Sequence, residues 1–269
     1  MNKEVKKIAI LGTTFILLIL LVGLSTSKIS EHATGEGTTR SSGYRTEIIS
    51  TTESTRERFA KEDKLIVPQG KEDEYFSDEI TIPRNLQVGE DGTITVIESI
   101  AINGELLDYE KEERIKQKNE SMRVTGVELI DLYENEDNSW TLIYDADNFE
   151  KNYQYLEWLF NRQAHGAFNK ISVSKDFKEI IIHLNDDATV FGIGMDIMAI
   201  KWCSVAAQIY SGTAYNEWNV HIIVVYEETG EQLYEFNFTE ADYEYHLTEE
   251  ELREKLEQAK QNAETNQKE

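Results

Sequence analysis

Residues 139–168, SWTLIYDADNFEKNYQYLEWLFNRQAHGAF, decide the fold class of this chain. The stretch begins by alternating apolar and polar residues, with Trp140, Leu142 and Tyr144 on one side, as a half-buried strand does. Asp147 then provides a helix cap with Glu150 three residues later. Apolar residues follow at a spacing of three to four. A strand followed at once by an amphipathic helix indicates a domain of the α+β class.

The pattern continues toward the C-terminus. Residues 170–185 predict two strands around a turn at 174–177, residues 187–211 predict a helix, and residues 217–238 predict a hairpin around Thr229-Gly230. From 139 to 226 the order is therefore β-α-β-β-α-β. This order resembles the ferredoxin-like arrangement, which implies one antiparallel sheet with the helices packed mainly on one face, here with an extra strand at 231–238. The resemblance is architectural and assigns no function.

Both ends of this unit carry further elements. Residues 92–104 alternate like a strand, and residues 105–122 read as a charged helix, so we expect an N-terminal subdomain at 61–122 before a core domain at 123–247. In the final segment, 248–269, Thr248 opens a capping box. The segment is expected to form a surface helix with a narrow apolar stripe of Leu252, Leu256, Ala259 and Ala263.

The N-terminus predicts a membrane anchor. Residues 8–27 carry no charge and follow three lysines; as a helix they are roughly 30 Å long, which matches the bilayer core. Residues 1–28 are therefore expected to be a single transmembrane signal anchor, with the N-terminus cytoplasmic and the globular part outside. Cleavage near Ser25-Thr26-Ser27 is the alternative and would make the protein secreted. Residues 29–60, rich in Ser, Thr and Gly, predict a flexible stalk.

The composition restricts the partners. The chain has 51 acidic and 27 basic residues among 269, for a net charge of −24. Such a charge repels nucleic acid, and we expect no nucleic-acid partner. We favour an acidic, well-hydrated surface over a specific cation-binding role. The single cysteine, Cys203, cannot form a disulfide within the chain and is expected to be a small buried residue.

No motif of known catalytic or metal-binding spacing occurs. His183 and His221 fall on predicted strands that the ferredoxin-like order separates by two strand spacings, about 9–10 Å, which is too far for one Zn²⁺. The acidic run at 133–139 lacks the spacing of an EF-hand loop and predicts a solvated turn. We therefore expect no metal and no cofactor.

Two surfaces are candidates for binding. The 187–211 helix is apolar on more than one side, with Phe191 and Trp202 on one stripe and Ile193 and Ile200 opposite. Either another part of the chain covers the second side, or a protein partner or a second copy does. On the helix before it, Trp158, Arg162 and His165 share one side and could form a small recognition patch. The alternative is that Trp158 packs under residues 61–122.

These features predict a membrane-anchored extracytoplasmic binding or interaction module of the kind that bacterial surfaces carry, and not an enzyme. The alternative is an extracellular hydrolase with an unrecognised carboxylate site, because so acidic a chain offers many carboxylate pairs. A cleft with two inward carboxylates of shifted pKa would favour the hydrolase. A third class, a small-molecule-binding domain, requires a real apolar pocket.

Overall fold

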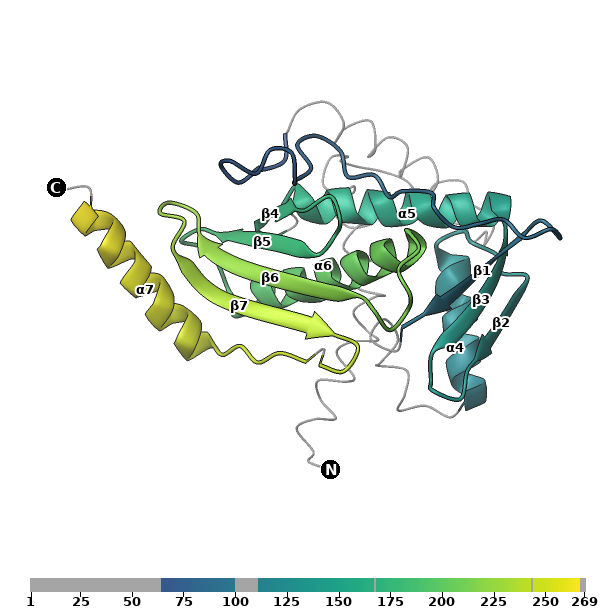
Figure 1. The fold of residues 1–269 in the computed structure, drawn as a ribbon. Helices are drawn as coiled ribbons and strands as arrows, with labels where there is room; N and C mark the ends of the chain where they lie inside the picture. The colour runs from purple at the N-terminus through teal and green to yellow at the C-terminus, as the bar shows by residue number, and fades with distance from the viewer. Residues whose placement is uncertain (1–63, 100–110, 167, 243, 267–269) are drawn as a thin grey trace, which may run out of the picture.

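The computed structural model describes residues 64–99, 111–166, 168–242 and 244–266. The predicted anchor and stalk lie outside these residues. The described residues form a mixed α+β fold with two sheets and four helices (Figure 1).

The first sheet has three antiparallel strands. β3 (Trp140–Asp145) lies in the centre, between β1 (Thr93–Glu98) and β2 (Asp131–Glu134). α4 (Lys111–Val124) packs on β2. The sequence did not predict β2, because its four residues run directly into the acidic turn that follows.

The second sheet has four strands in the order β4-β5-β6-β7. These are β4 (Lys170–Val173), β5 (Glu179–Leu184), β6 (Asn219–Tyr226) and β7 (Gln232–Thr239). β5 and β6 are parallel neighbours, while the other two pairs are antiparallel. β5, α6 and β6 thus form a βαβ unit, with the helix as the crossover that parallel strands need.

The predicted element order is confirmed, but the single antiparallel sheet of the ferredoxin-like arrangement is wrong. The strand at 140–145 was expected between β5 and β6, and it belongs to the other sheet instead. A strand has only two edges, and β1 and β2 occupy both edges of β3. β1 lies within the predicted subdomain 61–122, but it pairs with β3, which lies within the predicted core domain 123–247. The boundary predicted at 122 therefore runs through one sheet.

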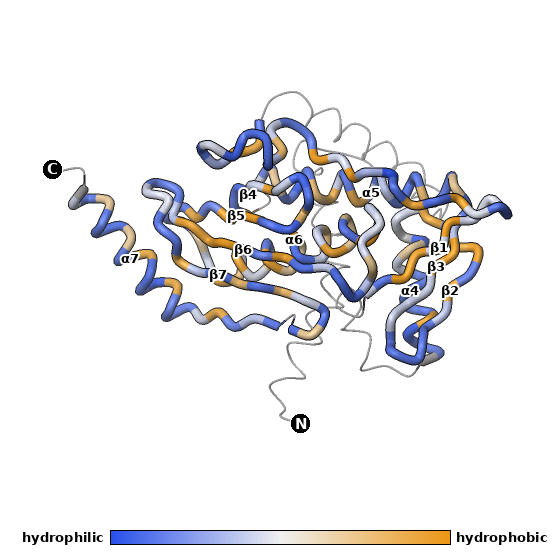
Figure 2. Tube along the Cα trace, viewed as in Figure 1, coloured by the Kyte–Doolittle hydropathy of each residue, from blue (hydrophilic) through white to orange (hydrophobic). Residues whose placement is uncertain are grey.

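Two long helices join the sheets. α5 (Ala146–Ala164) and α6 (Val190–Tyr210) pack against each other; α5 also contacts β3 and β4, and α6 contacts β1 and β6 (Figure 1). Asp145, not Asp147, caps α5, because its carboxylate accepts the N–H of Asn148 at 2.7 Å. Thr189 caps α6 in the same way. Apolar residues of the strands and helices form one continuous core cluster, and Figure 2 shows apolar stretches along β3, β5, β6 and α6.

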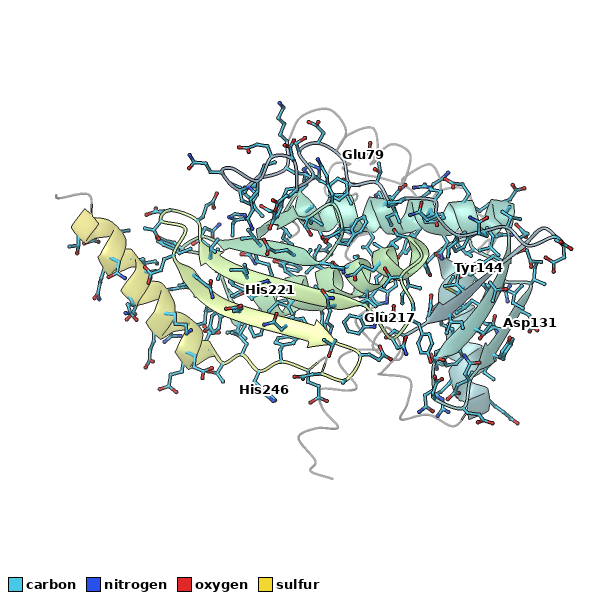
Figure 3. The ribbon with its side chains drawn as sticks, in the orientation of Figure 1. Glu79, Asp131, Tyr144, Glu217, His221 and His246 are labelled. Atoms are coloured by element: carbon cyan, nitrogen blue, oxygen red, sulfur yellow. The ribbon has the colours of Figure 1, made fainter. Side chains whose placement is uncertain are left out.

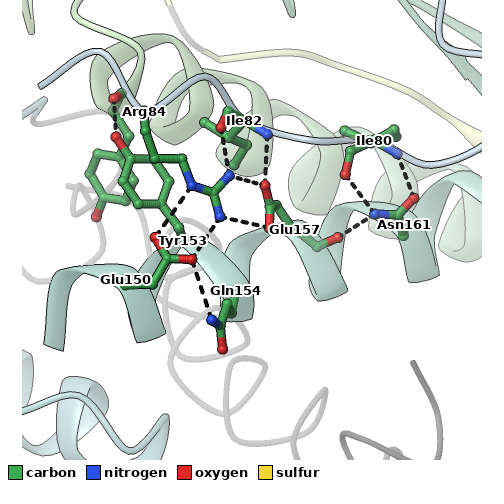
Figure 4. A network of polar contacts seen from close by, with 9 residues as sticks. Ile80, Ile82, Arg84, Glu150, Tyr153, Gln154, Glu157 and Asn161 are labelled. Atoms are coloured by element: carbon green, nitrogen blue, oxygen red, sulfur yellow. Dashed lines mark hydrogen bonds and ion pairs between the residues drawn. The ribbon is translucent and has the colours of Figure 1, made fainter. Parts of the chain in front are cut away.

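Two further segments complete the fold. α7 (Glu249–Asn266) buries the predicted stripe of Leu252, Leu256, Ala259 and Ala263, and the Lys255 ammonium donates to the carbonyl of Leu233 on β7. Residues 79–84 form an extended strap along α5 (Figures 1 and 4). Asn161 holds Ile80 through both of its backbone groups, and Glu157 accepts the N–H of Ile82 at 2.8 Å.

Candidate functional site

The outer side of α5 carries an aromatic and cationic group. Most residues of α5 are buried, but Tyr155, Trp158 and Arg162 are only half-buried, and their spacing of three to four places them on one side of the helix. The Arg162 guanidinium lies 5.6 Å from the centre of the Trp158 ring, and the Tyr155 and Trp158 ring centres are 5.9 Å apart. The predicted Trp158–Arg162 pair therefore exists as a cation–π contact.

The polar atoms of this group lack acceptors among the described residues. The indole Nε1 of Trp158 is enclosed and has no hydrogen-bond partner there. No described carboxylate forms an ion pair with Arg162, and burial lowers the pKa of its guanidinium. The Arg162 guanidinium thus remains available to a ligand rich in acceptors, whereas the enclosed Trp158 N–H is not accessible in this arrangement.

α6 continues the same surface. Burial raises the pKa of Tyr155 to about 12, and both Cys203 of α6 and Arg162 lie close enough to its hydroxyl to influence it. Tyr155 of α5 therefore lies beside the buried side of α6 that carries Cys203, and the two helices pack against each other. On α6 the outer stripe begins with Phe191, which is 61% exposed, and continues through Met198 and the half-buried Trp202.

The loop before β4 adds one more ring. Phe168 is 48% exposed and meets Phe191 edge to face, with ring centres 6.0 Å apart. Sequence reasoning missed Phe168, because it follows the end of α5 and belongs to no periodic pattern. We call this surface the aromatic face; it consists of Tyr155, Trp158, Arg162, Phe168, Phe191, Met198 and Trp202.

The two sides of α6 have different environments. Ile193, Ile197 and Ile200 are fully buried in the core, so the fold itself covers the side that was expected to need a partner. The stripe that contains Phe191 and Met198 is the exposed one. Within the described residues, α6 alone is long and apolar enough to cross a membrane, but most of it is buried in the fold.

His165 and the strap lie away from the centre of the aromatic face. His165 ends α5, where its N–H donates to the carbonyl of Asn161 at 2.9 Å. The strap contacts α5 at Glu157 and Asn161, a different side of the helix from Trp158. Its Arg84 guanidinium lies 4.4 Å from the centre of the Tyr153 ring. These contacts place one part of 61–122 on α5, at Glu157, Asn161 and Tyr153.

The aromatic face also lacks exposed carboxylates. From Gln154 to the end of α5 and throughout α6, the acidic residues are Glu157 and Asp196, and both are buried. Asp196 accepts the N–H and the side-chain amide of Asn169 at 3.0 and 2.6 Å, and burial raises its pKa to about 7. In a chain with 51 acidic residues, this surface is exceptional.

The opposite face of the four-stranded sheet carries charged residues instead (Figure 3). Glu179 pairs with Lys71 at 2.5 Å and accepts from Tyr75, and His221 lies between Glu179 and Glu235, at 3.7 and 2.9 Å. Partial burial opposes the ionisation of Glu179, but Lys71 and Tyr75 outweigh it and lower its pKa. The hydrogen bond from His221 lowers the pKa of Glu235. Both carboxylates are thus ionised near neutral pH, and neither suits the role of general acid.

The other polar groups on this sheet also lack the features of a catalytic site. His183 and His221 lie on adjacent strands, not two strands apart as expected; the register pairs His221 with Glu179, four residues before His183. Ser172 and His183 are 2.8 Å apart, but Ser172 is completely buried, so no substrate reaches its hydroxyl. Burial raises the pKa of Cys203, consistent with the small buried residue expected from the sequence.

A shallow hollow of about 440 Å³ lies beside the turn after β2, lined by Ile97, Asn135, Thr141, Tyr215 and their neighbours. Its polar groups already bind one another; for example, the Tyr215 hydroxyl donates to Asp137 at 2.5 Å. It does not have the enclosed apolar shape of a small-molecule site. In the part of the chain that the structure describes, no three His, Cys, Asp or Glu side chains are grouped to hold a metal ion.

Comparison of the chain with known protein families, curated proteins and solved structures finds no match.

Proposed function

We propose that this protein is a membrane-anchored, extracytoplasmic interaction module that binds its partner through the aromatic face. The observation that carries this proposal is the composition of that face. Five aromatic rings, one methionine and one arginine gather on the outer side of α5, α6 and the Phe168 loop without an exposed carboxylate. Aromatic residues and arginine are the residues most enriched at binding surfaces, and charged residues are depleted from their centres.

The hydrolase alternative receives no comparable support. A carboxylate pair for acid–base chemistry needs one member of raised pKa that a substrate can reach. The exposed pair, Glu179 and Glu235, has lowered pKa values, and Asp196, whose pKa is raised, is fully enclosed. The binding role is therefore the better supported of the two.

The orientation is testable with introduced cysteines, because the only native thiol, Cys203, is buried. A membrane-impermeant maleimide added to intact cells should label Thr51→Cys in the predicted stalk. The matched control, Asn2→Cys, should be labelled only after the membrane is permeabilised. Labelling of Thr51→Cys only after permeabilisation would contradict an extracytoplasmic domain.

The binding role is testable with a photo-crosslinking amino acid. Met198, on the aromatic face, should give a crosslinked product in intact cells. Ile130, which is 56% exposed and precedes β2, serves as the control and should not. Equal yields at the two positions would show that the aromatic face has no special role.

A further inference from the structure

We propose that the aromatic face binds the surface of the lipid bilayer that holds the anchor, so that the domain lies against the membrane instead of projecting from it. This inference rests on the proposed membrane anchor and names the partner of the same site. Four independent features of the described residues and of the tether favour a bilayer over a protein partner or a second copy.

The first feature is the choice of side chains. Trp and Tyr concentrate where a bilayer meets water, because their rings are apolar and their N–H or O–H groups are polar. The aromatic face has two Trp and one Tyr, with Phe168, Phe191 and Met198 around them. The two exposed phenylalanines contact each other at one end, so they present a single apolar projection about as wide as two rings.

The second feature is charge. A domain with so many carboxylates is repelled by anionic lipid head groups, so it approaches such a surface only with a face that lacks them. The aromatic face meets this condition within the described residues of α5 and α6, since Glu157 is covered by the strap and Asp196 is buried in the fold. Arg162 contributes a cation near its centre, and a guanidinium attracts and binds the phosphate groups of lipids.

The third feature is the pair of donors without acceptors. The Trp158 indole N–H and the Arg162 guanidinium find no carboxylate or carbonyl among the described residues. The head-group region of a bilayer is rich in phosphate and ester oxygens, which accept hydrogen bonds from such groups. A purely apolar protein surface would leave the Arg162 guanidinium unmatched; the Trp158 N–H is enclosed and meets head-group oxygens only when the ring turns outward.

The fourth feature is the tether. Residues 29–60 are the predicted stalk, and a flexible chain of about 32 residues has a root-mean-square span of roughly 30 Å. The strap at 79–84, farther along the chain, is fixed to α5 through Asn161 and Glu157 (Figure 4). A short flexible link gives an effective concentration in the millimolar range, so even a weak affinity for lipid keeps the domain docked.

The test uses the full chain, one copy per lipid nanodisc, with lipids that carry bromine on their acyl chains as fluorescence quenchers. All four tryptophans of the chain lie in the described residues, and Trp140 and Trp218 are 1% and 2% exposed. Quenching should therefore come from Trp158 and Trp202. Trp158→Phe/Trp202→Phe should lose most of the quenching, Arg162→Glu should reduce it, and the control Lys116→Glu on exposed α4 should leave it unchanged.

The outcomes separate the inference from the proposed function. If the chain stays in the nanodisc but the brominated lipids quench neither Trp158 nor Trp202, the docking inference is wrong and the anchor stands. If nanodiscs with one copy show quenching but nanodiscs with two copies do not, and if aqueous acrylamide also fails to quench the two-copy discs, the two copies cover each other's aromatic face. A second copy is then the true occupant and the inference is overturned. If the full chain does not associate with lipid at all, the proposed anchor itself fails.

Discussion

Asn161 is the residue whose replacement tests the architecture around α5 most directly. Its side chain binds the strap as a neighbouring β-strand would: Oδ1 accepts the N–H of Ile80 at 2.8 Å, and Nδ2 donates to the carbonyl of Ile80 at 2.9 Å (Figure 4). Nδ2 also donates to the carbonyl of Glu157 at 2.8 Å. We expect Asn161→Ala to loosen the strap and to destabilise the fold.

The magnitude follows from burial. Ile80 is 0% exposed, so water cannot replace the lost partners of its N–H and carbonyl groups. Each such orphaned group costs about 1–3 kcal/mol, and the better helix propensity of alanine returns about 0.5 kcal/mol. For the two groups together the expected loss is therefore about 1.5–5.5 kcal/mol. Asn161→Asp, which buries a carboxylate with one oxygen against the carbonyls of Ile80 and Glu157, should cost at least as much as the alanine variant.

Hydrogen exchange and chemical denaturation measure this effect together. Since each 1.4 kcal/mol is a factor of ten, the amide of Ile80 should exchange roughly 10- to 8,000-fold faster in Asn161→Ala. Gln154→Ala is the matched control, because Gln154 is exposed on the same helix and donates only a 3.3 Å bond to Glu150. The reasoning is refuted if Asn161→Ala costs less than about 1 kcal/mol, or no more than the control, in urea unfolding.

Three further predictions concern single buried or strained residues. Lys118→Met should cost about 3–5 kcal/mol in urea unfolding, because it removes the cation 2.5 Å from buried Glu98; exposed Lys116→Met should cost under about 0.5 kcal/mol, and equal losses would contradict the claim. The pKa of Asp196 is about 7 in the fold, above its value of 3.8 in a model compound, so the folded state holds the proton that the unfolded chain releases. The contribution of Asp196 to the free energy of unfolding is therefore fully present below about pH 4 and is lost between about pH 4 and 7, by up to about 4 kcal/mol. Asp196→Asn should remove that pH dependence, and an unchanged pH profile of stability would refute the claim. Gly212→Ala should lower the melting temperature, at a cost of about 1–2 kcal/mol, because the backbone there has φ of +100°; an unchanged melting temperature would show that the turn tolerates a side chain.

Part of the candidate site was predictable from the sequence. A helical spacing of four brings Trp158 and Arg162 together whatever the fold, because neighbours on a helix surface are set by local geometry. The exposed stripe of Phe191, Met198 and Trp202 was also visible. Which side of α6 faces solvent was not, since both sides are apolar and only the packing of the isoleucines against the sheet selects one.

The sequence by itself determined the local elements. Alternation and helical periodicity identify β1, β3 to β7 and the helices α5, α6 and α7, although the residue that caps α5 is Asp145 and not the predicted Asp147. These signals depend on residues within one or two turns of each other. The tertiary structure alone decided how the strands divide between two sheets, that β5 and β6 run parallel, and that Phe168 meets Phe191 on the outer side of α6. The physical reason is that alternation shows which face of a strand is buried but not which strand lies beside it, and pairing partners distant in sequence are chosen only when the whole core packs.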